Sequence, residues 1–567
     1  MKLIFTTFFI VIAFTSSIAQ STAERVFTIF QTSCTFSSCH SNAGQALGLN
    51  LEGSGPNAMM DVYNNIINAT PNNVHAAGEN NKLIMPGDPS RSFLFRKING
   101  NGELDAGLSL HSEEGGAMPQ NASPLDLEDL ELVRQWILHG APLSGEVIDV
   151  AIIDEFYNNN GVQSISNPPA KPDPSEGFQL HLGPFFLPPG TEREVFLKHN
   201  LFLEEDIEVT AVETTMGIQS HHFIINKFLP ANTTVCNLPL SNDGPDGFAD
   251  GFRNVNSSSH FSALFQVGAQ ESERLEVPYN TAFFWQQGTV IDLNSHYINA
   301  NQNQVLAAEV YVNVYTQEAG LAKEELQSIM LPNTDISIPN DGEPHTLTQN
   351  VPVFFCYPNG IYLWSLSSHT HKLGQDFDIY KSNAAGANVE HLYDGSCYED
   401  GAPDCEVEDF DYQHPPVREF EDYYRLASTD WLKQEATYIN NTDNEVGFGL
   451  TSEDEMMIMF LFFVEDTTDL HEPEIPSGLF QNNLEELSVF PNPTNGSVSL
   501  SSNNRSDVSE VKLLSIHGQT VKSANFIQQD GLIIVDIQNS KIPTGIYWLM
   551  VEYEDQTRSI AKIIYTK

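Results

Sequence analysis

Two histidines separated by one residue, His369 and His371, stand in the stretch SSHTHKLG late in the chain. In a β-strand, residues i and i+2 point to the same face, so this spacing can present two imidazoles to one metal ion. The competing interpretation is a pair of exposed strand histidines, and the motif alone does not decide between the two. A metal site would need further ligands, so the rest of the chain decides between the two interpretations.

Three other segments between residues 178 and 465 carry metal-binding side chains. His221 and His222 lie in SHHFII, His296 lies in DLNSHYIN, and Met456 lies in TSEDEMMIMFLFF. Adjacent strand residues face opposite sides, so His221 and His222 can share one ion only if the strand bulges or the two rings use different nitrogens. Taken singly, these histidines are more typical of satisfied polar residues and Met456 is more typical of core.

The order of these groups carries more information than any one of them. The series HHF, HY, HTHKLG and SxDEM resembles the copper type II monooxygenases, the family of peptidylglycine α-hydroxylating monooxygenase and dopamine β-monooxygenase. The resemblance extends to the residues before the first pair, ETTMGIQSHHF. It implies two copper-binding, jelly-roll-like β-sandwich subdomains, at residues 178–325 and 326–470.

Carried over position by position, the resemblance implies two copper ions with different tasks. The electron-transfer copper would be held by His221, His222 and His296. The catalytic copper, where dioxygen binds and a substrate C–H bond is hydroxylated, would be held by His369, His371 and Met456. The donor atoms agree with this, because imidazole suits both copper oxidation states and a thioether favours Cu(I).

The chain also departs from that family at three positions. An Arg that grips the substrate carboxylate in the peptide-hydroxylating enzyme is replaced by Ser367, a Tyr is replaced by Phe460, and a Cys is replaced by Met457. These differences argue against a C-terminal peptide glycine as the substrate. They leave an extracellular small molecule or polymer fragment, which the sequence does not name.

A second kind of redox motif, CTFSSCH, occupies residues 34–40 near the N-terminus. Haem c is attached through two cysteine thioethers, with the His directly after the second Cys as an iron ligand. Here Cys34, Cys39 and His40 fit this arrangement, although the loop between the cysteines is two residues longer than usual. The alternative is a small disulfide between Cys34 and Cys39.

Downstream segments resemble the cytochrome c domains that are fused to exported bacterial enzymes. They are IMPGDPSRSFLFRKI, the Met-Pro loop GGAMPQ, and the helical pattern LDLEDLELVRQWILHGAP. The resemblance implies a small all-α haem domain at residues 21–150 and a distal iron ligand at Met118. Met85 also precedes a proline and is the competing candidate.

These resemblances imply a secreted copper-dependent and dioxygen-dependent monooxygenase that receives electrons through its haem c domain from an external donor. Ascorbate is the alternative donor, and a haem domain that only anchors or senses is a further possibility. The competing function is a non-catalytic electron-transfer or copper-binding surface protein. Oxygen uptake coupled to a hydroxylated product distinguishes the enzyme from this competitor.

The acidic composition and the N-terminal segment together predict an exported protein that does not bind polyanions. The 567 residues carry a formal charge of −49, which argues against nucleic acid or anionic membranes as partners. Residues 1–20 have one Lys, an apolar run and small residues, as in a cleaved export signal. No later stretch is long and apolar enough to span a bilayer, so we expect no transmembrane segment after cleavage.

Disulfides are possible in an exported protein, and four further cysteines are available for them. Cys397 and Cys405 flank an acidic loop and are candidates for a local bridge, whereas pairing of Cys236 with Cys356 is left open. The acidic run NDGPDGFADG at residues 242–251 is either a calcium site or a solvated loop, and the second is the more common.

The last predicted domain occupies residues 485–567. Short alternating segments with turn signals predict a small β-sandwich. Its opening VFPNPTNG and its final strand resemble the sorting domains of the type IX secretion system, which implies that the secretion machinery is a partner and that the protein is secreted or attached to the cell surface. Proline-rich composition predicts linkers at residues 151–177 and 471–484.

Overall fold

The computed structural model describes residues 20–566 with gaps, and the chain folds into two compact units, residues 1–470 and 471–567. The residues outside the description are 1–19, 101, 103, 160, 229–233, 236–237, 240–244, 254–261, 269–271, 354–356, 397–409, 413–414, 450, 452, 471–484, 493, 502–506, 516–519, 530–531, 538–541, 543–544, 555–557 and 567. The predicted export signal therefore lies outside the described residues.

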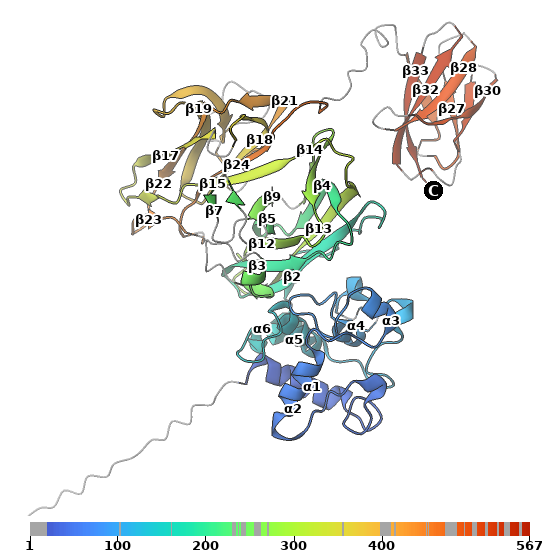
Figure 1. Cartoon of the computed structure of the whole chain (residues 1–567), viewed down its shortest axis with the longest axis vertical. Coiled ribbons are helices and arrows are strands. Elements are labelled where there is room, and N and C mark those ends of the chain that lie inside the picture. Colours follow the sequence, from blue (N-terminus) through green and yellow to red (C-terminus); the bar gives the residue numbers. More distant parts are fainter. Residues whose placement is uncertain are drawn as a thin grey trace, which may run out of the picture. The chain divides into compact units, whose positions relative to one another are not determined.

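The first unit begins with a helical domain, drawn in blue in Figure 1. Its α-helices are α1 (Thr22–Cys34), α2 (Ala58–Ile66), α3 (Val74–Gly78), α4 (Phe93–Asn99), α5 (Leu127–Leu138) and α6 (Val150–Asn158). Helix α1 begins at a capping box in which Ser21 and Glu24 satisfy each other's backbone N–H groups. Apolar faces of α1, α2, α4 and α5 form one core around Phe30, Phe95 and Trp136.

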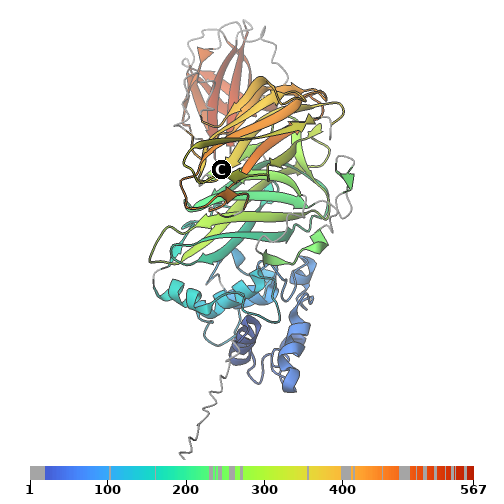
Figure 2. The ribbon, with the colours of Figure 1, turned by 90° about the vertical axis from the view of Figure 1, so that its left-hand side faces the viewer.

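A β-sandwich follows, shown in green in Figures 1 and 2. One sheet has the order β1-β13-β4-β11-β14, with β2 on β13 and β10 on β4, and the other has the order β8-β3-β12-β5-β9. The long strands are β2 (Gly177–Leu187), β3 (Glu192–Asn200), β4 (Ile207–Met216), β5 (Ser220–Phe228), β9 (Ser262–Gly268), β12 (Val290–Ile298) and β13 (Leu306–Glu318). The short ones are β1 (Val162–Gln163), β8 (Gly251–Arg253), β10 (Ser272–Glu276), β11 (Thr281–Trp285) and β14 (Glu324–Glu325).

A second β-sandwich completes this unit. Its four-stranded sheets have the orders β15-β24-β18-β21 and β17-β22-β19-β20. The strands are β15 (Gln327–Pro332), β17 (Pro344–Pro352), β18 (Ile361–Thr370), β19 (Gly374–Ser382), β20 (Asn388–Asp394), β21 (Arg418–Leu426), β22 (Trp431–Ile439) and β24 (Met457–Val464). Trp364 and Phe462 from this sandwich pack into the core of the first one, against Phe283. The two sandwiches are therefore joined through a shared apolar contact.

The segment that was predicted as a linker, residues 151–177, is largely packed against its neighbours. Helix α6 occupies residues 150–158, and β1 pairs in parallel with the start of β13. Further along, the backbone carbonyl of Ala170 accepts a hydrogen bond from the Asn313 side chain. Only the Pro-rich part of this segment has no regular structure, so the chain here does not behave as a free tether.

The second unit contains two packed sheets with the orders β25-β33-β32-β28-β29 and β26-β27-β31-β30. Its strands are β25 (Glu485–Glu486), β26 (Ser488–Phe490), β27 (Ser497–Ser501), β28 (Val508–Leu514), β29 (Thr520–Ser523), β30 (Asn525–Gln529), β31 (Leu532–Asp536), β32 (Gly545–Tyr553) and β33 (Arg558–Tyr565). Alternating side chains of both sheets form its core around Leu500, Val535 and Leu549. The structure is thus rich in β-sheet and contains several sandwiches, as the sequence predicts.

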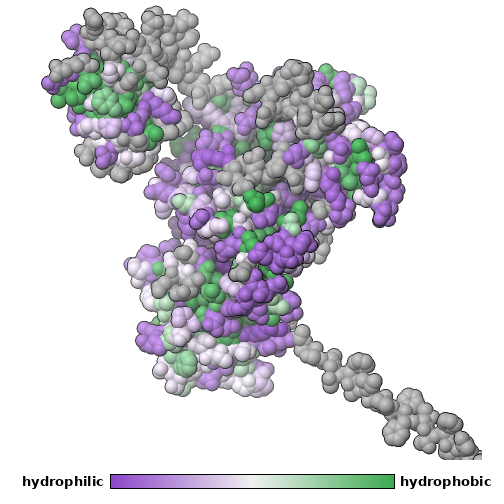
Figure 3. Space-filling view, turned by 180° about the vertical axis from the view of Figure 1, so that it is seen from behind, coloured by the Kyte–Doolittle hydropathy of each residue, from purple (hydrophilic) through white to green (hydrophobic). Residues whose placement is uncertain are grey.

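The surface agrees with the acidic composition. On the face of the molecule in Figure 3, hydrophilic side chains cover much of the described surface and hydrophobic ones are scattered between them. No helix among the described residues is long and apolar enough to cross a membrane.

Candidate metal centre

The first histidine group lies on the sheet of β5 and β12. His222 and His296 are directly opposite each other on these neighbouring strands. The pairing then shifts, so that Tyr297 is opposite Ser220 and His221 is the extra residue of a β-bulge. This bulge is one of the two arrangements that would let adjacent histidines face one ion.

The second group lies on β18 and β24 of the other sandwich. His369 pairs with Ile458 and Thr370 pairs with Met457, so Met456 follows in register beside His371. Met456 is buried and packs with Ile458 and Phe460, which alternate on one side of β24. Ile224 of β5 packs against this small cluster and brings the two histidine-bearing sheets together.

The two groups form a single cluster of five buried imidazoles. The ring centroids of His221, His222 and His296 lie 5.2 to 5.5 Å from one another. His369 lies 5.8 Å from His221 and 5.7 Å from His222, and 5.3 Å from His371. One ring nitrogen from each of His221, His222 and His369 lies within 4.8 Å of the others. The two predicted ligand sets are therefore adjacent rather than far apart.

Three of these imidazoles are oriented by a polar contact at one of their two ring nitrogens. His296 contacts Glu192 through Nε2 at 3.1 Å, His222 lies 3.4 Å from Glu194 through Nε2, and His371 donates from Nδ1 to the Asp454 carbonyl at 3.0 Å.

The opposite nitrogens of the same three rings, His222 Nδ1, His296 Nδ1 and His371 Nε2, are buried and have no hydrogen-bond partner among the described residues. Buried nitrogens are almost always paired, so this arrangement is typical of metal ligands oriented by a carboxylate or carbonyl.

Burial and neighbouring charges favour the neutral form of two imidazoles of the cluster, His296 and His369. Burial and the neighbouring His222 lower the pKa of His296 to about 4. Burial and the adjacent imidazoles lower the pKa of His369 well below its usual range. Neutral imidazole is the ligand form of histidine, so the site is ready for a cation near neutral pH.

Glu455 is an additional residue of the site that the sequence interpretation did not single out. Its fully buried carboxylate accepts backbone hydrogen bonds from His371 at 2.9 Å, Leu373 at 2.7 Å and Met456 at 3.2 Å. Burial raises its pKa to about 7. The Glu455 side chain thus connects the segment of His369 and His371 to Met456. The sequence feature that could have indicated this role is an acidic residue directly before Met456.

We expect Glu455→Ala to weaken metal binding without removing a ligand. The change leaves three buried backbone donors unsatisfied, at a cost of about 1 to 3 kcal/mol each. Copper titration and thermal unfolding should both show the loss, and Glu455→Gln, which keeps an acceptor, should lose less. Equal copper affinity in wild type and Glu455→Ala would show that this bridge does not position the ligands.

Three further positions are Tyr412 and two at which the chain departs from the family that it resembles. The ring centroid of Tyr412 lies 6.2 Å from that of His221, a contact that no motif of the sequence indicates. Ser367, which replaces the family's arginine, donates its hydroxyl to the Pro416 carbonyl. Phe460 is buried in the cluster with Met456.

The predicted haem ligands lie in the helical domain. Cys34 and Cys39 are free thiols rather than a disulfide, and burial raises the pKa of Cys34 to about 11. The backbone of His40 donates to the Cys34 carbonyl, and His40 Nδ1 lies 3.2 Å from the Leu49 carbonyl. With Nδ1 bound in this way, Nε2 is the nitrogen left for a metal.

Both methionine candidates lie against the same domain. Met118 is half-buried at the edge of the helical core, and its backbone N–H donates to the Lys97 carbonyl. Met85 is buried, and its backbone N–H donates to the Ser92 hydroxyl. These contacts do not choose between the two residues, so Met118 stays the prediction.

Other sequence predictions fall partly or wholly outside the description. All four cysteines of the predicted disulfides lie outside the described residues. In the acidic run, residues 242–244 do too, but Lys198 binds the described part through the carbonyls of Pro245 and Phe248 and the carboxylate of Asp250. An ammonium group therefore already supplies positive charge to this loop.

Comparison with protein families decides the nature of the second unit. Residues 488–566 match the model of the secretion system C-terminal sorting domain. This tail is a sorting domain. It belongs to the type IX class, and it indicates export to the cell surface or the medium. No monooxygenase or cytochrome c family model matches, and no curated protein sequence matches the chain.

Solved structures give only distant likenesses. The chain is 9% identical to PBCV-1 VP54, fitted into a reconstruction of the virophage Sputnik, over 52% of this chain and 95% of that one, with a TM-score of 0.20. It is 8% identical to the major capsid protein P2 of bacteriophage PM2, over 51% and 98%, with a TM-score of 0.20. At such scores the likenesses support neither a fold nor a function.

Proposed function

We propose that this protein is a secreted copper-dependent and dioxygen-dependent monooxygenase that hydroxylates a C–H bond and receives electrons through a haem c domain. The observation that carries the proposal is the cluster of five buried histidines, with unpartnered nitrogens on His222, His296 and His371. The identity of the ligands and the monooxygenase reaction come from the family resemblance, and the geometry supports them.

The residues present fit copper better than the hard cations. Imidazole nitrogens with a nearby thioether suit Cu(I) and Cu(II), whereas magnesium and calcium take oxygen ligands. Copper, when bound, would supply one-electron chemistry and dioxygen activation at this place. His221, His222 and His296 would hold one ion, and His369, His371 and Met456 would hold the other.

The chain's own contribution is to bury and orient these groups. Ile224 of the first sandwich packs against Met456, Ile458 and Phe460 of the second, which holds the two histidine-bearing sheets together. Glu192 and Glu194 fix the orientation of two rings on the first sheet. Glu455 fixes the backbone of the second set. Preorganisation of this kind limits the rearrangement that metal and substrate binding require.

The helical domain fits covalent haem at residues 34–40. Two reduced thiols and a histidine directly after the second one are the groups that thioether attachment and iron ligation need. Haem, when attached, would supply a one-electron carrier that an external donor reduces. In this proposal the domain is an electron donor to copper and not an anchor or a sensor.

A product screen with isotopically labelled dioxygen tests the proposal. Copper-loaded and haem-loaded protein is incubated with candidate small molecules and polysaccharide or peptide fragments, and products are analysed by mass spectrometry. We expect one labelled oxygen atom in a hydroxylated product, with matching oxygen uptake. Full copper and haem loading without oxygen incorporation into any substrate would favour a non-catalytic electron-transfer or copper-binding protein.

A further inference from the structure

The helical domain and the first sandwich meet in a close, fixed contact near the end of α5. A Cβ atom on Gly140 would lie 2.4 Å from the Asp250 carbonyl oxygen, and one on Gly251 would lie 2.3 Å from the Gly140 nitrogen. Both glycines have positive φ angles, so no other residue fits there easily. Beside them, the Arg91 guanidinium lies 4.4 Å above the Phe202 ring.

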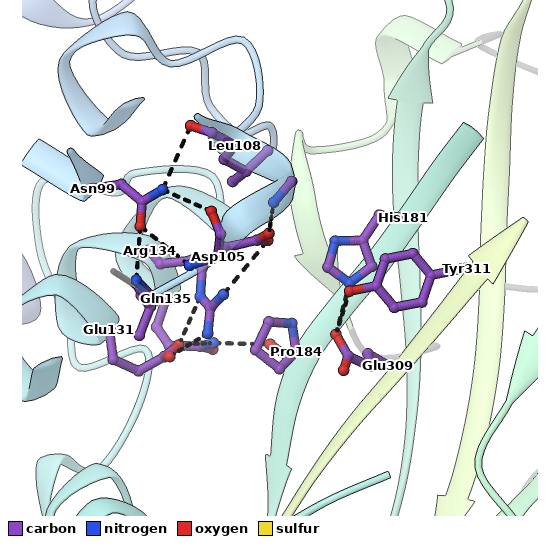
Figure 4. Close-up of polar contacts among 12 residues, drawn as sticks. Asn99, Asp105, Leu108, Glu131, Arg134, Gln135, His181, Pro184, Glu309 and Tyr311 are labelled. Carbon is purple, nitrogen blue, oxygen red and sulfur yellow. Dashed lines mark hydrogen bonds and ion pairs between the residues drawn. The ribbon is translucent and has the colours of Figure 1, made fainter. Parts of the chain in front are cut away.

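A polar part of the same interface is shown in Figure 4. Gln135 of α5 donates to the Pro184 carbonyl of β2, beside the buried ion pair of Glu131 and Arg134. A cavity of about 320 Å³ lies here, and Glu309 and Tyr311 of β13 line its other side. The charges on both sides of this cavity are already paired, so we infer no ligand for it.

A hydrogen bond crosses the interface between His139 and Arg193. His139 follows α5 directly, and its Nδ1 lies 2.8 Å from the Gln135 carbonyl, to which it donates. Its Nε2 is then the acceptor for Arg193 Nη2, at 3.2 Å. Burial and the Arg193 charge lower the pKa of His139 to about 4, which keeps Nε2 unprotonated at neutral pH.

The residues on either side of Arg193 contact two predicted copper ligands. Glu192 Oε2 lies 3.1 Å from His296 Nε2, and Glu194 Oε1 lies 3.4 Å from His222 Nε2. Strand alternation puts Arg193 on one face of β3 and both glutamates on the other. Three consecutive residues therefore connect the helical domain to the histidine cluster through the thickness of one sheet.

A series of aromatic rings ends at the same place. The His139 ring lies 5.3 Å from Phe252, Phe252 lies 5.9 Å from Phe185, and Phe185 lies 5.8 Å from Tyr297. Tyr297 directly follows His296 in β12 and is completely buried. These ring contacts form a second series from His139 to the residue beside His296, parallel to the hydrogen bond that Arg193 donates to His139.

We propose that the segment Glu192-Arg193-Glu194 of β3 is the route by which electrons pass from the helical domain to His222 and His296. The proposal rests on the proposed function. One electron passes from haem iron(II) to copper(II), giving iron(III) and copper(I), and no bond is formed or broken. An external one-electron donor then restores iron(II).

Stopped-flow absorbance of the haem bands tests this route in the full-length, copper-loaded protein. The haem is reduced rapidly by a flash-generated donor, and its reoxidation by copper(II) is followed without dioxygen or substrate. We expect Arg193→Met to slow reoxidation by an order of magnitude or more, while copper content and the thermal midpoint stay close to wild type. Arg193→Lys restores a donor to His139 and should recover part of the rate.

Arg91→Ala is the matched control, because it removes another arginine contact across the same interface, to Phe202, and leaves Glu192, Arg193 and Glu194 unchanged. We expect it to reoxidise at the wild-type rate. Equal rates for Arg193→Met and wild type, or equal slowing in Arg193→Met and Arg91→Ala, would overturn the route while leaving the proposed function intact. Wild-type protein that binds haem and copper but shows no reoxidation would overturn both.

Discussion

Replacing His369 by Ala is expected to reduce hydroxylated product below detection. His369 is buried at the junction of the two ligand sets, with His221, His222 and His371 all within 5.8 Å between ring centroids. Alanine removes one of the three proposed ligands of the catalytic copper and leaves a space among the remaining imidazoles. We therefore expect loss of one copper per chain, with the ion on His222 and His296 retained.

Copper analysis and oxygen uptake on the same preparation check this expectation. His345→Ala is the matched control, because His345 lies in β17 and pairs with Asp341 at the surface. It should keep both coppers and full turnover. Loss of both coppers in His369→Ala would show that the five histidines bind as one inseparable unit, and retention of turnover would exclude His369 from catalysis.

Deleting residues 471–567 is expected to abolish delivery to the surface and to leave the enzyme active. The sorting domain is a separate compact unit with its own core, and a sorting signal is read by a receptor rather than by the active site. Cell fractionation with a periplasmic marker should find the truncated protein in the periplasm, with the same copper content and turnover as the full chain.

A fusion protein tests whether the tail is also sufficient for surface delivery. Residues 471–567 attached to an unrelated exported protein should direct it to the surface. Normal surface delivery of the truncated chain would show that the tail is not the address. Loss of copper from the truncated protein would instead indicate that the tail supports the fold of the first unit.

Local features of the metal centre could be predicted from the sequence because they follow from strand geometry. The spacing of His369 and His371 predicts a common strand face, and a bulge, which β5 contains, was one of two predicted ways for His221 and His222 to share an ion. The adjacency of the two ligand sets could not be predicted. It depends on contacts between sandwiches, such as Ile224 against Met456, which no periodicity within one strand encodes.

The packing of the helical domain against the first sandwich could not be predicted from the sequence either. Proline-rich composition predicted a linker at residues 151–177, whereas the structure shows close backbone contact between Gly140 and Gly251. Each of these glycines is unremarkable alone, and only the tertiary fold makes their lack of a Cβ atom necessary. Helix α6 did leave a signal, because Ile153 and Phe156 are three residues apart and both are buried.

Glu455 shows a further limit. A glutamate at the start of an apolar strand is normally solvated, so the residue type alone predicts an exposed side chain. In the fold, the Glu455 carboxylate accepts hydrogen bonds from three backbone N–H groups. Two of these belong to His371 and Leu373, which lie more than eighty residues before Glu455 in the sequence. Such roles follow from long-range hydrogen bonding, which spacing along the chain does not reveal.

Metal analysis of the purified, signal-cleaved protein is the most direct test of the metal centre. After chelation, the protein is titrated anaerobically with Cu(I) and, separately, with Zn(II), and bound metal is measured by mass spectrometry beside the haem absorbance. We expect two tightly bound copper ions and one covalent haem per chain, with nitrogen and sulfur ligation in the X-ray absorption spectrum. Tight binding of zinc with only weak binding of copper, or binding of no metal at these histidines, would contradict a copper monooxygenase.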